Sequence, residues 1–386
     1  MVKRILVVGM LDSIHLARWL EQFKDEKLDI SIFPSRKYRF MHPQLWSLTQ
    51  SRNIANFQII GSSQKIFQFG HVDFILKEVL GKIFKSLNRK YSLQKTLKKY
   101  NFDLIHAIEI QGAGYLVGSI EKIFYKKSKI ILTNWGSDIY YFMKNPKHLD
   151  LIKNLLKIVH YYSAECERDY ELAQDLGFSG QELPCIPNSG GFDVSRDHLT
   201  YVKPSLRNQI IVKGYGGLFG RPDILTQVIE KICIEFPNVN FYIYSVTKDS
   251  KKLIKDLPEH VRKKIKYSSV RHNLSRLDLL NQFSKSRIYI GCSESDGIST
   301  SFLESLISGS YPIQSNTSCA DEWIKKGAVG SVVPLNFEII MESLRSAMLD
   351  VNLVDSASEI NYAVSQKYLS HEYISGIAKK FYIDYS

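Results

Sequence analysis

One stretch in the second half of the chain constrains the fold more than any other. It runs from Ile288 to Asn316 and reads IYIGCSESDGISTSFLESLISGSYPIQSN. Its β-branched and aromatic start predicts a buried strand that ends at Gly291, and a polar turn follows. Residues 298–308 then predict a helix that Gly309 ends, before a second strand begins. A strand, a helix and another strand in this order are typical of a parallel α/β sheet.

The predicted helix has two chemically different faces. Glu304 lies at i, i+4 spacing from both Thr300 and Ser308, so one face carries a carboxylate among hydroxyl groups. That face suits contact with a polar ligand. The opposite face suits packing against a sheet and consists of Phe302, Leu303, Leu306 and Ile307.

The turn before this helix predicts a seat for a phosphate. Asp296 precedes the turn, and eight residues of helical rise place it roughly 10–12 Å from Glu304. That span is comparable to the distance from a sugar, across a diphosphate, to a ribose. The alternative is that Asp296 caps the helix and Glu304 is solvated, because capping acids are common. Backbone N–H groups and the positive helix end converge on Gly297, Ile298, Ser299 and Thr300.

The same stretch resembles the acid-x7-acid motif of the family-4 retaining glycosyltransferases, which have the GT-B fold. Ser293-Glu294-Ser295-Asp296-Gly297, Leu303-Glu304-Ser305 and Gly309-Ser310-Tyr311-Pro312-Ile313 match that motif in order. Asp296 departs from it, since the family usually has Glu there, which is one methylene longer. The resemblance implies an α/β protein with two Rossmann-like, doubly wound domains that face a cleft. It also implies transfer of a sugar from a nucleotide diphosphate donor with retention of anomeric configuration.

A length of 386 residues indicates two domains, because it exceeds one ordinary hydrophobic core. Strand and helix patterns alternate through both halves, which predicts parallel sheets. Pro and Gly cluster from residue 187, so we place an acceptor-side domain at 1–187 and a nucleotide-sugar-binding domain at 188–386. The resemblance implies that the last helix, at about 362–386, crosses back to the first domain.

Composition predicts a soluble, cytoplasmic protein. Hydrophobic residues make up 44% and charged residues 23%, and no run of eighteen apolar residues predicts a membrane span. The apolar run after Met1 is too short for a signal peptide and reads as a first strand. Five scattered cysteines without C-x-x-C spacing argue against disulfides and a zinc site.

Positive charge is concentrated in the first half of the chain. Residues 1–187 contain 27 Lys and Arg against 18 Asp and Glu, whereas the remainder contains 24 against 21. The most basic stretch, Phe69 to Tyr100, alternates lysines with apolar residues at helical spacing. It predicts a basic amphipathic helix on an anionic membrane surface, and the alternative is a core-packed helix with a solvated lysine face. No known nucleic-acid-binding motif organises these basic residues.

The acceptor side is expected at the ends of the first strands. Gly9 ends the first strand and His15 lies near the start of the next helix; without G-x-G-x-x-G, a dinucleotide is not favoured. The Phe-Asp-Leu-Ile-His-Ala segment ending in His106 and Ala107 resembles a strand end of the family. Residues 134–138 resemble its His-Gly-Ser-Asp turn, with Trp135 where the family often has His. Asp138 then faces the cleft or, alternatively, caps a helix.

A second glycine-rich turn follows the predicted strand 209–213. Gly214 begins it and Arg221 ends it, in the place of the family's Gly-Arg-x5-Lys turn. Glycines let the backbone approach a ligand, and Arg forks onto phosphate oxygens. The available cations are Lys213 and Arg221, and we favour Arg221.

The resemblance assigns a role to each of these residues. Glu304 holds the donor ribose, Asp296 holds the transferred sugar, and Arg221 with Lys213 neutralises the diphosphate leaving group. His106, Asp138 and the Gly9 turn line the acceptor side. No metal or other cofactor is implied, and no D-x-D pair is present.

The expected acceptor is a glycan or a lipid-linked sugar, in bacterial-type surface polysaccharide or glycolipid synthesis at the inner face of the plasma membrane. Two alternatives remain open. One is a GT-B sugar-nucleotide epimerase, and the other is a non-catalytic protein that binds a nucleotide sugar or nucleic acid.

Overall fold

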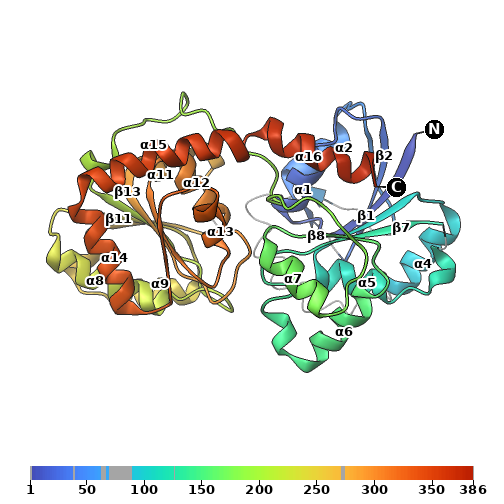
Figure 1. Cartoon of the computed structure of the whole chain (residues 1–386), viewed down its shortest axis with the longest axis horizontal. Helices are drawn as coiled ribbons and strands as arrows, with labels where there is room; N and C mark the ends of the chain where they lie inside the picture. Colours follow the sequence, from blue (N-terminus) through green and yellow to red (C-terminus); the bar gives the residue numbers. More distant parts are fainter. Residues whose placement is uncertain are drawn as a thin grey trace. The chain divides into compact units, whose positions relative to one another are not determined.

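A computed structural model describes residues 2–37, 40–61, 67–68, 89–125, 127–270 and 274–385. The chain forms two compact units: in Figure 1 the first runs from blue to green and includes the red carboxyl-terminal helix, and the second runs from green to red. Unit 1 contains the residues up to Gly191 together with Glu372–Ser386, and unit 2 runs from Phe192 to His371. The first unit thus extends a few residues beyond the predicted boundary at 187/188.

Unit 1 contains a seven-stranded sheet in which all recorded pairs are parallel. In chain order its strands are β1 (Lys3–Gly9), β2 (Leu28–Pro34), β4 (Asn56–Ile59), β6 (Leu104–Ile108), β7 (Lys129–Thr133), β8 (Tyr161–Ser163) and β9 (Gln181–Glu182). They lie side by side in the order β4-β2-β1-β6-β7-β8-β9. A separate parallel pair consists of β3 (Phe40–Met41) and β5 (Phe67–Gln68).

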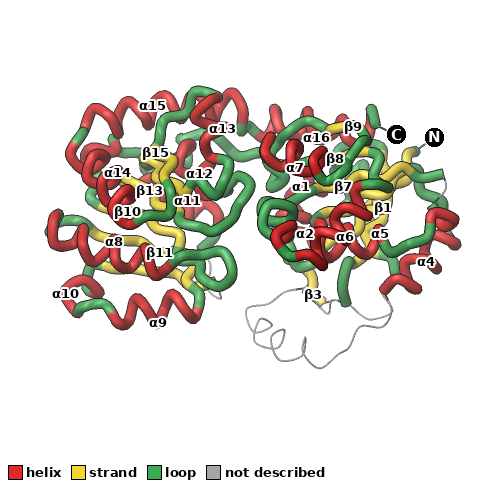
Figure 2. The backbone as a smooth tube through the Cα atoms, turned by 60° about the horizontal axis from the view of Figure 1, so that its bottom comes forward, coloured by secondary structure: helices red, strands yellow, loops and turns green. Residues whose placement is uncertain are grey.

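Helices cover both faces of this sheet because β1 is apolar on both sides. Ile5 and Val7 pack on one face with one group of helices, and Leu6 and Val8 pack on the other face with a second group. The first group is α1 (Ile14–Glu21), α2 (Pro43–Gln50) and α16 (His371–Ile383). The second group is α4 (Arg89–Lys99), α5 (Tyr115–Gly118), α6 (Pro146–Leu156) and α7 (Glu167–Asp175), and Figure 2 shows the helices around the strands.

Unit 2 contains a six-stranded parallel sheet in the order β12-β11-β10-β13-β14-β15. Its strands are β10 (Gln209–Lys213), β11 (Asn240–Val246), β12 (Ile265–Ser269), β13 (Ser286–Gly291), β14 (Tyr311–Ser315) and β15 (Ser331–Val333). Its helices are α8 (Pro222–Glu235), α9 (Lys248–Asp256), α10 (Glu259–Arg262), α11 (Arg276–Ser284), α12 (Thr300–Ser308), α13 (Ala320–Lys325), α14 (Phe337–Leu349) and α15 (Val351–Tyr368).

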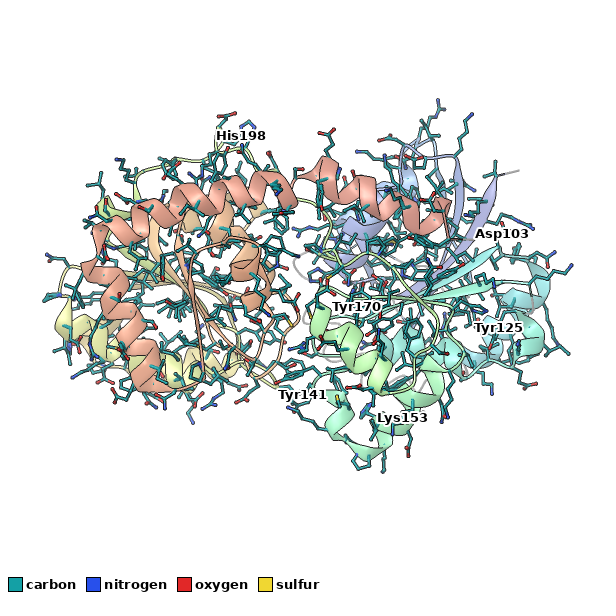
Figure 3. The ribbon with its side chains drawn as sticks, viewed as in Figure 1. Asp103, Tyr125, Tyr141, Lys153, Tyr170 and His198 are labelled. Carbon is teal, nitrogen blue, oxygen red and sulfur yellow. The ribbon has the colours of Figure 1, made fainter. Side chains whose placement is uncertain are left out.

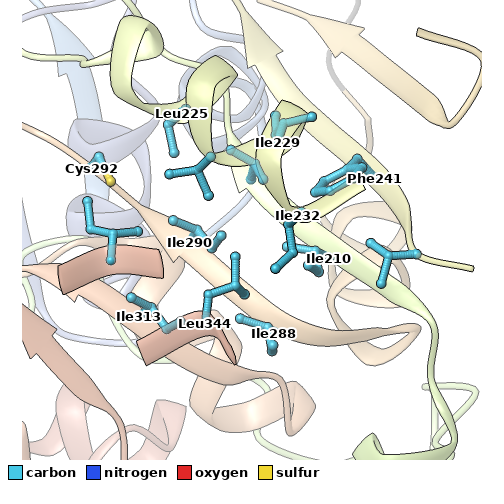
Figure 4. Close-up of a cluster of buried hydrophobic side chains, with 14 of the residues drawn as sticks. Ile210, Leu225, Ile229, Ile232, Phe241, Ile288, Ile290, Cys292, Ile313 and Leu344 are labelled. Carbon is cyan, nitrogen blue, oxygen red and sulfur yellow. The ribbon is translucent and has the colours of Figure 1, made fainter. Parts of the chain in front are cut away.

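One face of the unit 2 sheet packs into an aliphatic core (Figure 4). Ile210 of β10 and Ile288 of β13 meet Ile232 of α8 and Leu344 of α14, and all four side chains are fully buried. This interior explains why β10 and β13 read as continuous apolar runs, since strands of a parallel sheet are covered on both faces. None of the described helices is long and apolar enough to cross a membrane.

The strand order reverses once in each sheet, between β1 and β6 in unit 1 and between β10 and β13 in unit 2. Both units are therefore doubly wound and Rossmann-like, which confirms the predicted fold class. Ligands of such sheets bind outside the carboxyl ends of the strands at the reversal point. The strands beside the two reversal points, β1, β6, β10 and β13, end at Gly9, Ile108, Lys213 and Gly291.

The end of the chain differs from the single returning helix expected at about 362–386. Two helices occupy it: α15 ends at Tyr368 in unit 2, and α16 carries the chain into unit 1. Tyr382 of α16 is fully buried, accepts a hydrogen bond from Trp19 Nε1 at 3.0 Å, and stacks on Phe23 at 4.3 Å between ring centroids. Helix α16 is thus part of the core of unit 1.

Candidate functional site

The turn after β13 does not end where the sequence predicted. Helix α12 begins at Thr300, with Ser299 as its N-cap, so Ile298 and Ser299 belong to the turn. Asp296 lies three residues before that cap, and its Oδ1 accepts a hydrogen bond from Gly297 N at 3.0 Å. The alternative reading of Asp296 as a helix cap is therefore wrong. The Ser299 side chain makes no capping hydrogen bond, so the first N–H groups of α12 point into the turn without a side-chain acceptor from the N-cap.

Lys213 and Asp296 face each other across the reversal point of the unit 2 sheet. Lys213 is the last residue of β10, and its Nζ lies 3.8 Å from Asp296 Oδ2. Both side chains are partly exposed, at 30% and 26%. The pair places one positive and one negative group where a doubly wound sheet binds its ligand.

The glycine-rich loop after β10 is held against the turn after β13. Gly214 N donates to the Tyr244 carbonyl oxygen at 2.8 Å, and a Cβ at Gly214 would lie 2.5 Å from Ile243 Cγ2, so only glycine fits. Further along, Gly220 forms an antiparallel bridge with Ser293. The loop and the turn therefore form one continuous surface.

Arg221 is engaged by two carboxylates. Its Nη2 lies 2.7 Å from Asp223 Oδ2 and its Nη1 lies 2.8 Å from Glu294 Oε1. The hydrogen bonds that Arg221 donates to Asp223, more than the one it donates to Glu294, raise the pKa of Arg221 above its usual value. Arg221 thus joins the glycine-rich loop to the turn that contains Asp296.

Glu304 is buried, with 4% of its surface exposed, which contradicts the alternative of a solvated side chain. It lies near Tyr244 at the end of β11: burial first, and then the neighbouring Tyr289 and Glu304 groups, raise the pKa of Tyr244 well above its usual value. The next residue, Ser245, has a φ of 54°, at an irregularity in the β11–β12 register. Ser245 lies one residue before the end of β11, and sequence analysis assigned no role to it.

In unit 1 the structure brings three predicted acceptor-side residues to the carboxyl ends of the strands. Gly9 ends β1, and His15 lies in the first turn of α1, whose N-cap Ser13 accepts from His15 N at 3.1 Å. The His15 ring meets the Trp135 ring edge-on, with centroids 5.5 Å apart. The imidazole and the indole therefore form a common aromatic surface above the sheet.

Asp138 joins the turn after β7 to the segment after β6. Its Oδ2 accepts from Trp135 N at 3.0 Å and from Ile110 N at 2.8 Å. The helical turn that follows, Phe142–Lys144, has Tyr141 as its N-cap, so Asp138 does not cap it. Burial, and next the charge of Glu109, raise the pKa of Asp138 well above its usual value. Asp138 is therefore a buried acid whose pKa is raised by its surroundings.

Glu109 is a site residue to which sequence analysis assigned no role. It follows β6 at the reversal point of the unit 1 sheet, is 4% exposed, and has a φ of 77°. Its carboxylate accepts from Gly112 N at 2.7 Å and Ala113 N at 2.6 Å at the start of a π-helix, Ile110–Gly114. The signal in the sequence was an acid directly after a buried strand and before two glycines.

His106 does not line the acceptor side. It is fully buried within β6, with Nδ1 2.8 Å from the Tyr382 hydroxyl and Nε2 2.6 Å from the Thr133 hydroxyl. Burial lowers the pKa of His106 to about 3, so it is neutral at physiological pH. Its place is in the core between β6 and α16, which corrects the predicted assignment.

Within either unit taken alone, the described residues contain no cluster of three His, Cys, Asp or Glu side chains at metal-binding distance. Asp223 and Glu294 both form ion pairs with Arg221 at the end of the glycine-rich loop. Two cationic side chains lie beside the turn after β13, those of Lys213 and Arg221.

Comparisons with known proteins give a family for the first part of the chain. Residues 4–165 match the family model described as glycosyl transferase 4-like. No curated protein sequence matches the chain significantly.

Solved structures share the fold of the whole chain at low sequence identity. HepE of Anabaena is 12% identical with a TM-score of 0.67, and the match covers 99% of each chain. Sucrose-phosphate synthase of Thermosynechococcus elongatus is 11% identical with a TM-score of 0.71, over 99% of this chain and 98% of that one. A glycosyltransferase of Rickettsia africae is 16% identical with a TM-score of 0.64, over 99% and 98%. Residues 4–165 are therefore similar to the glycosyl transferase 4-like family, and the chain as a whole has the GT-B fold.

Proposed function

We propose that the protein is a glycosyltransferase that moves a sugar from a nucleotide diphosphate sugar to an acceptor, with retention of configuration. The observation that supports this most directly is the Lys213–Asp296 pair, at 3.8 Å, at the reversal point of the unit 2 sheet. The same turn leads into α12 and its buried Glu304. The glycosyl transferase 4-like match of residues 4–165 supports the same reaction class.

The donor is proposed to lie along the turn between β13 and α12. Glu304 accepts hydrogen bonds from the ribose hydroxyls, and Asp296 accepts them from the transferred sugar. The N–H groups at Gly297–Thr300 and the Lys213 ammonium bind the diphosphate, on which negative charge accumulates as the sugar leaves. The resemblance to the family implies that no metal takes part, so activity is expected to persist in EDTA.

We rank Lys213 above Arg221 as the cation for the diphosphate, in contrast to the ranking from sequence. Arg221 already binds Asp223 and Glu294, whereas Lys213 meets one carboxylate at 3.8 Å and stands at the end of β10. Arg221 is then a positioning residue that keeps the glycine-rich loop in place.

Variants of these two residues test the donor site. In calorimetry, Lys213→Met should lower the affinity for UDP at least tenfold and leave the affinity for uridine unchanged, because only the diphosphate loses its partner. Arg221→Ala should lower the affinities for UDP and for uridine to a similar degree and should also lower the melting temperature. Lys231→Met on α8, whose side chain is 50% exposed, is the matched control. Equal UDP affinity in Lys213→Met and wild type would contradict the proposed diphosphate site.

Uridine donors are the first to screen, because HepE structures contain UDP and UDP-glucose. A thermal-shift screen of nucleotide diphosphate sugars identifies the base and the sugar. Slow hydrolysis of that donor without acceptor, followed by proton NMR, reports the stereochemistry: a retaining enzyme first releases sugar with the donor's configuration. Donor binding without hydrolysis or transfer to any acceptor would favour the non-catalytic alternative, and conversion of the donor sugar to its epimer would favour an epimerase.

The acceptor is proposed to be a glycan or a lipid-linked sugar of surface polysaccharide or glycolipid synthesis, with unit 1 docked on an anionic membrane. The charge excess of residues 1–187 supports this, although residues 69–88 of the predicted basic helix lie outside the described residues. Each Lys near an anionic leaflet contributes about 1 kcal/mol.

Liposome co-sedimentation at low and high salt tests the docking. The pair Lys82→Glu and Lys85→Glu should weaken binding to anionic vesicles without lowering the melting temperature. Arg89 does not belong in this set, because its Nη1 donates to the Gly61 carbonyl oxygen at 3.0 Å and its guanidinium stacks on Phe33. If the wild-type protein does not bind anionic vesicles at low salt, the proposed membrane docking is wrong and a soluble acceptor is favoured.

A further inference from the structure

A pocket of unit 1 lies at the opposite end of the sheet from Trp135 and Asp138. Its volume is about 460 Å³, within the range of small-molecule sites. Phe102, which precedes β6, and Ser128, which precedes β7, both line it, so it opens at the amino ends of these strands. Doubly wound sheets bind their ligands at the carboxyl ends of the strands, so this pocket is separate from the candidate site.

The floor of the pocket is apolar and its rim is incompletely covered. Leu97 of α4, Phe102 and Tyr125 line it and are each less than a tenth exposed. At the rim, Ile123 is 63% exposed and Tyr100 is 38% exposed. Figure 3 labels Tyr125 beside α4 and Asp103 at the same edge of unit 1. Exposed aliphatic and aromatic groups beside an apolar floor favour an occupant with an apolar part.

The charge at this pocket is positive and unbalanced. Lys98 and Lys127 line it, and none of the lining residues is acidic. Lys98 Nζ lies 5.1 Å from the centre of the Phe124 ring, which holds the ammonium at the pocket wall. In the part of the chain that the structure describes, no carboxylate forms an ion pair with either lysine. An anion therefore complements the site, and a metal ion does not.

Few side chains are available to read the edge of a nucleobase. The Ser128 hydroxyl already donates to the Phe102 carbonyl oxygen at 2.7 Å. Asn101 is the one amide among the lining residues. An alkyl chain needs no such partner, whereas a base that is buried without its hydrogen bonds loses free energy.

We propose that this pocket binds an amphiphilic phosphate, with its alkyl chain on Tyr125 and Ile123 and its phosphate at Lys98 and Lys127. The site is distinct from the proposed transfer reaction and does not depend on it. Such a ligand has two sources, a phospholipid of a bilayer or a soluble alkyl phosphate, and both share this chemistry.

Calorimetry with octyl phosphate, below its micelle concentration, tests the pocket itself. We expect saturable binding to the full chain, at least tenfold tighter than inorganic phosphate or UMP, because only octyl phosphate uses both the lysines and the apolar floor. No saturable binding of octyl phosphate, or equal affinity for UMP, would overturn the proposal.

Surface variants locate the binding without risk to the fold. The double variant Lys98→Ala, Lys127→Ala should lower the affinity for octyl phosphate at least tenfold, and Ile123→Asn should lower it severalfold. The control is Lys153→Ala with Lys157→Ala, which removes the same charge from exposed positions in α6 and at its C-cap. All three proteins should keep wild-type UDP affinity, so failure here is distinguishable from failure of the donor site. If the Lys98, Lys127 double variant binds octyl phosphate like the control, the pocket is not the site.

Flotation with vesicles of phosphatidylcholine, with and without phosphatidic acid, separates the two sources. Flotation that needs phosphatidic acid and is lost in the Lys98, Lys127 double variant assigns the pocket to a bilayer lipid. Binding of monomeric octyl phosphate without flotation assigns it to a soluble ligand. Flotation that is the same in the double variant and in the control, together with no binding of octyl phosphate, would show that the vesicles attach elsewhere and that the proposal is wrong.

Discussion

A carboxylate that is 4% exposed, as Glu304 is, needs polar partners, because burial of an unpaired charge is costly. If its partners in the working protein include the donor ribose, Glu304→Gln removes charge-assisted hydrogen bonds worth about 1.5–3 kcal/mol. We therefore expect UDP affinity to fall roughly 10- to 100-fold in calorimetry. The melting temperature without ligand should change little, since the amide keeps the shape of the side chain.

The control is Asp321→Asn, a carboxylate on α13 that is 54% exposed. It should bind UDP like wild type. A Glu304→Gln protein with wild-type UDP affinity would mean that Glu304 serves only the packing of α12.

Asp138 should make stability fall as the pH rises. Burial, with the charge of Glu109, raises its folded pKa well above the usual 3.8, so between these two values the folded state keeps a proton that the unfolded state releases. Between these two pKa values the Asp138 carboxyl group lowers the stability of the folded protein as the pH rises, by about 1.4 kcal/mol for each pH unit. Asp138→Asn, an analogue of the protonated acid, should escape this loss.

Thermal melts at pH 5 and pH 8 measure the effect. Asp138→Asn should gain melting temperature relative to wild type at pH 8, and Asp150→Asn on the exposed side of α6 should not. If Asp138→Asn is instead more destabilised at pH 8 than at pH 5, the carboxyl group is ionised in the folded protein.

At the scale of elements, the end of α12 depends on a glycine and on its neighbour α15. Gly309 has a φ of 78°, and a Cβ there would lie 2.3 Å from Ser358 Oγ of α15. Arg196 bonds to both helices, since it donates to the Ile307 carbonyl oxygen at 2.9 Å and to the Ser358 carbonyl oxygen at 2.9 Å. The helix that carries Glu304 is therefore fixed at its carboxyl end by contacts with α15.

Gly309→Ala should destabilise unit 2 by about 1–3 kcal/mol, because it combines a left-handed backbone with a steric clash. Gly376→Ala is the matched control: nothing lies within 4 Å of its added methyl group in α16, and Ala favours a helix by up to about 1 kcal/mol. Urea unfolding should thus shift in opposite directions for the two variants. A neutral Gly309→Ala would show that α15 moves to accommodate the methyl group.

Elements that depend on local sequence were the ones that could be predicted. The strand ending at Gly291 and the helix ending at Gly309 follow from residue periodicity and from glycine's backbone freedom. The start of that helix could not be predicted, because Asp296 and Ser299 are both good caps and the choice depends on the fold. His106 was misplaced because its burial comes from Tyr382, 276 residues away in the chain.

The burial of Glu304 escaped sequence analysis for a related reason. The polar face of an amphipathic helix is usually exposed to solvent, but every residue of α12 from Ser301 to Ser308 is buried. The Glu304 carboxyl group lies near Tyr244 of β11, so neighbouring parts of unit 2 cover the face that looked solvent-exposed in sequence. Periodicity identifies the apolar face of a helix and does not show what covers the other.

At the scale of the whole molecule, Tyr382 should decide the stability of unit 1. Tyr382→Phe leaves Trp19 Nε1 and His106 Nδ1 without their partner, and each unsatisfied buried group costs about 1–3 kcal/mol. Tryptophan fluorescence reports the loss, since Trp19, Trp46 and Trp135 lie in unit 1. The fluorescence melt should shift down by several degrees.

Tyr385→Phe, which removes a hydroxyl near the same end of the chain, should leave that melt unchanged. Equal melts for Tyr382→Phe and wild type would mean that water replaces the lost hydroxyl.

The return of α16 into unit 1 has a consequence for synthesis on the ribosome. Residues up to Gly191 emerge first, yet their aromatic core stays open around Trp19 until Glu372 and the residues after it have left the exit tunnel. Unit 2 is complete earlier, because all of its residues precede that point. Domains usually finish folding in the order in which they are translated, and here the first to begin is the last to close. A chain truncated after His371 should therefore contain a protease-resistant unit 2 and a protease-sensitive unit 1.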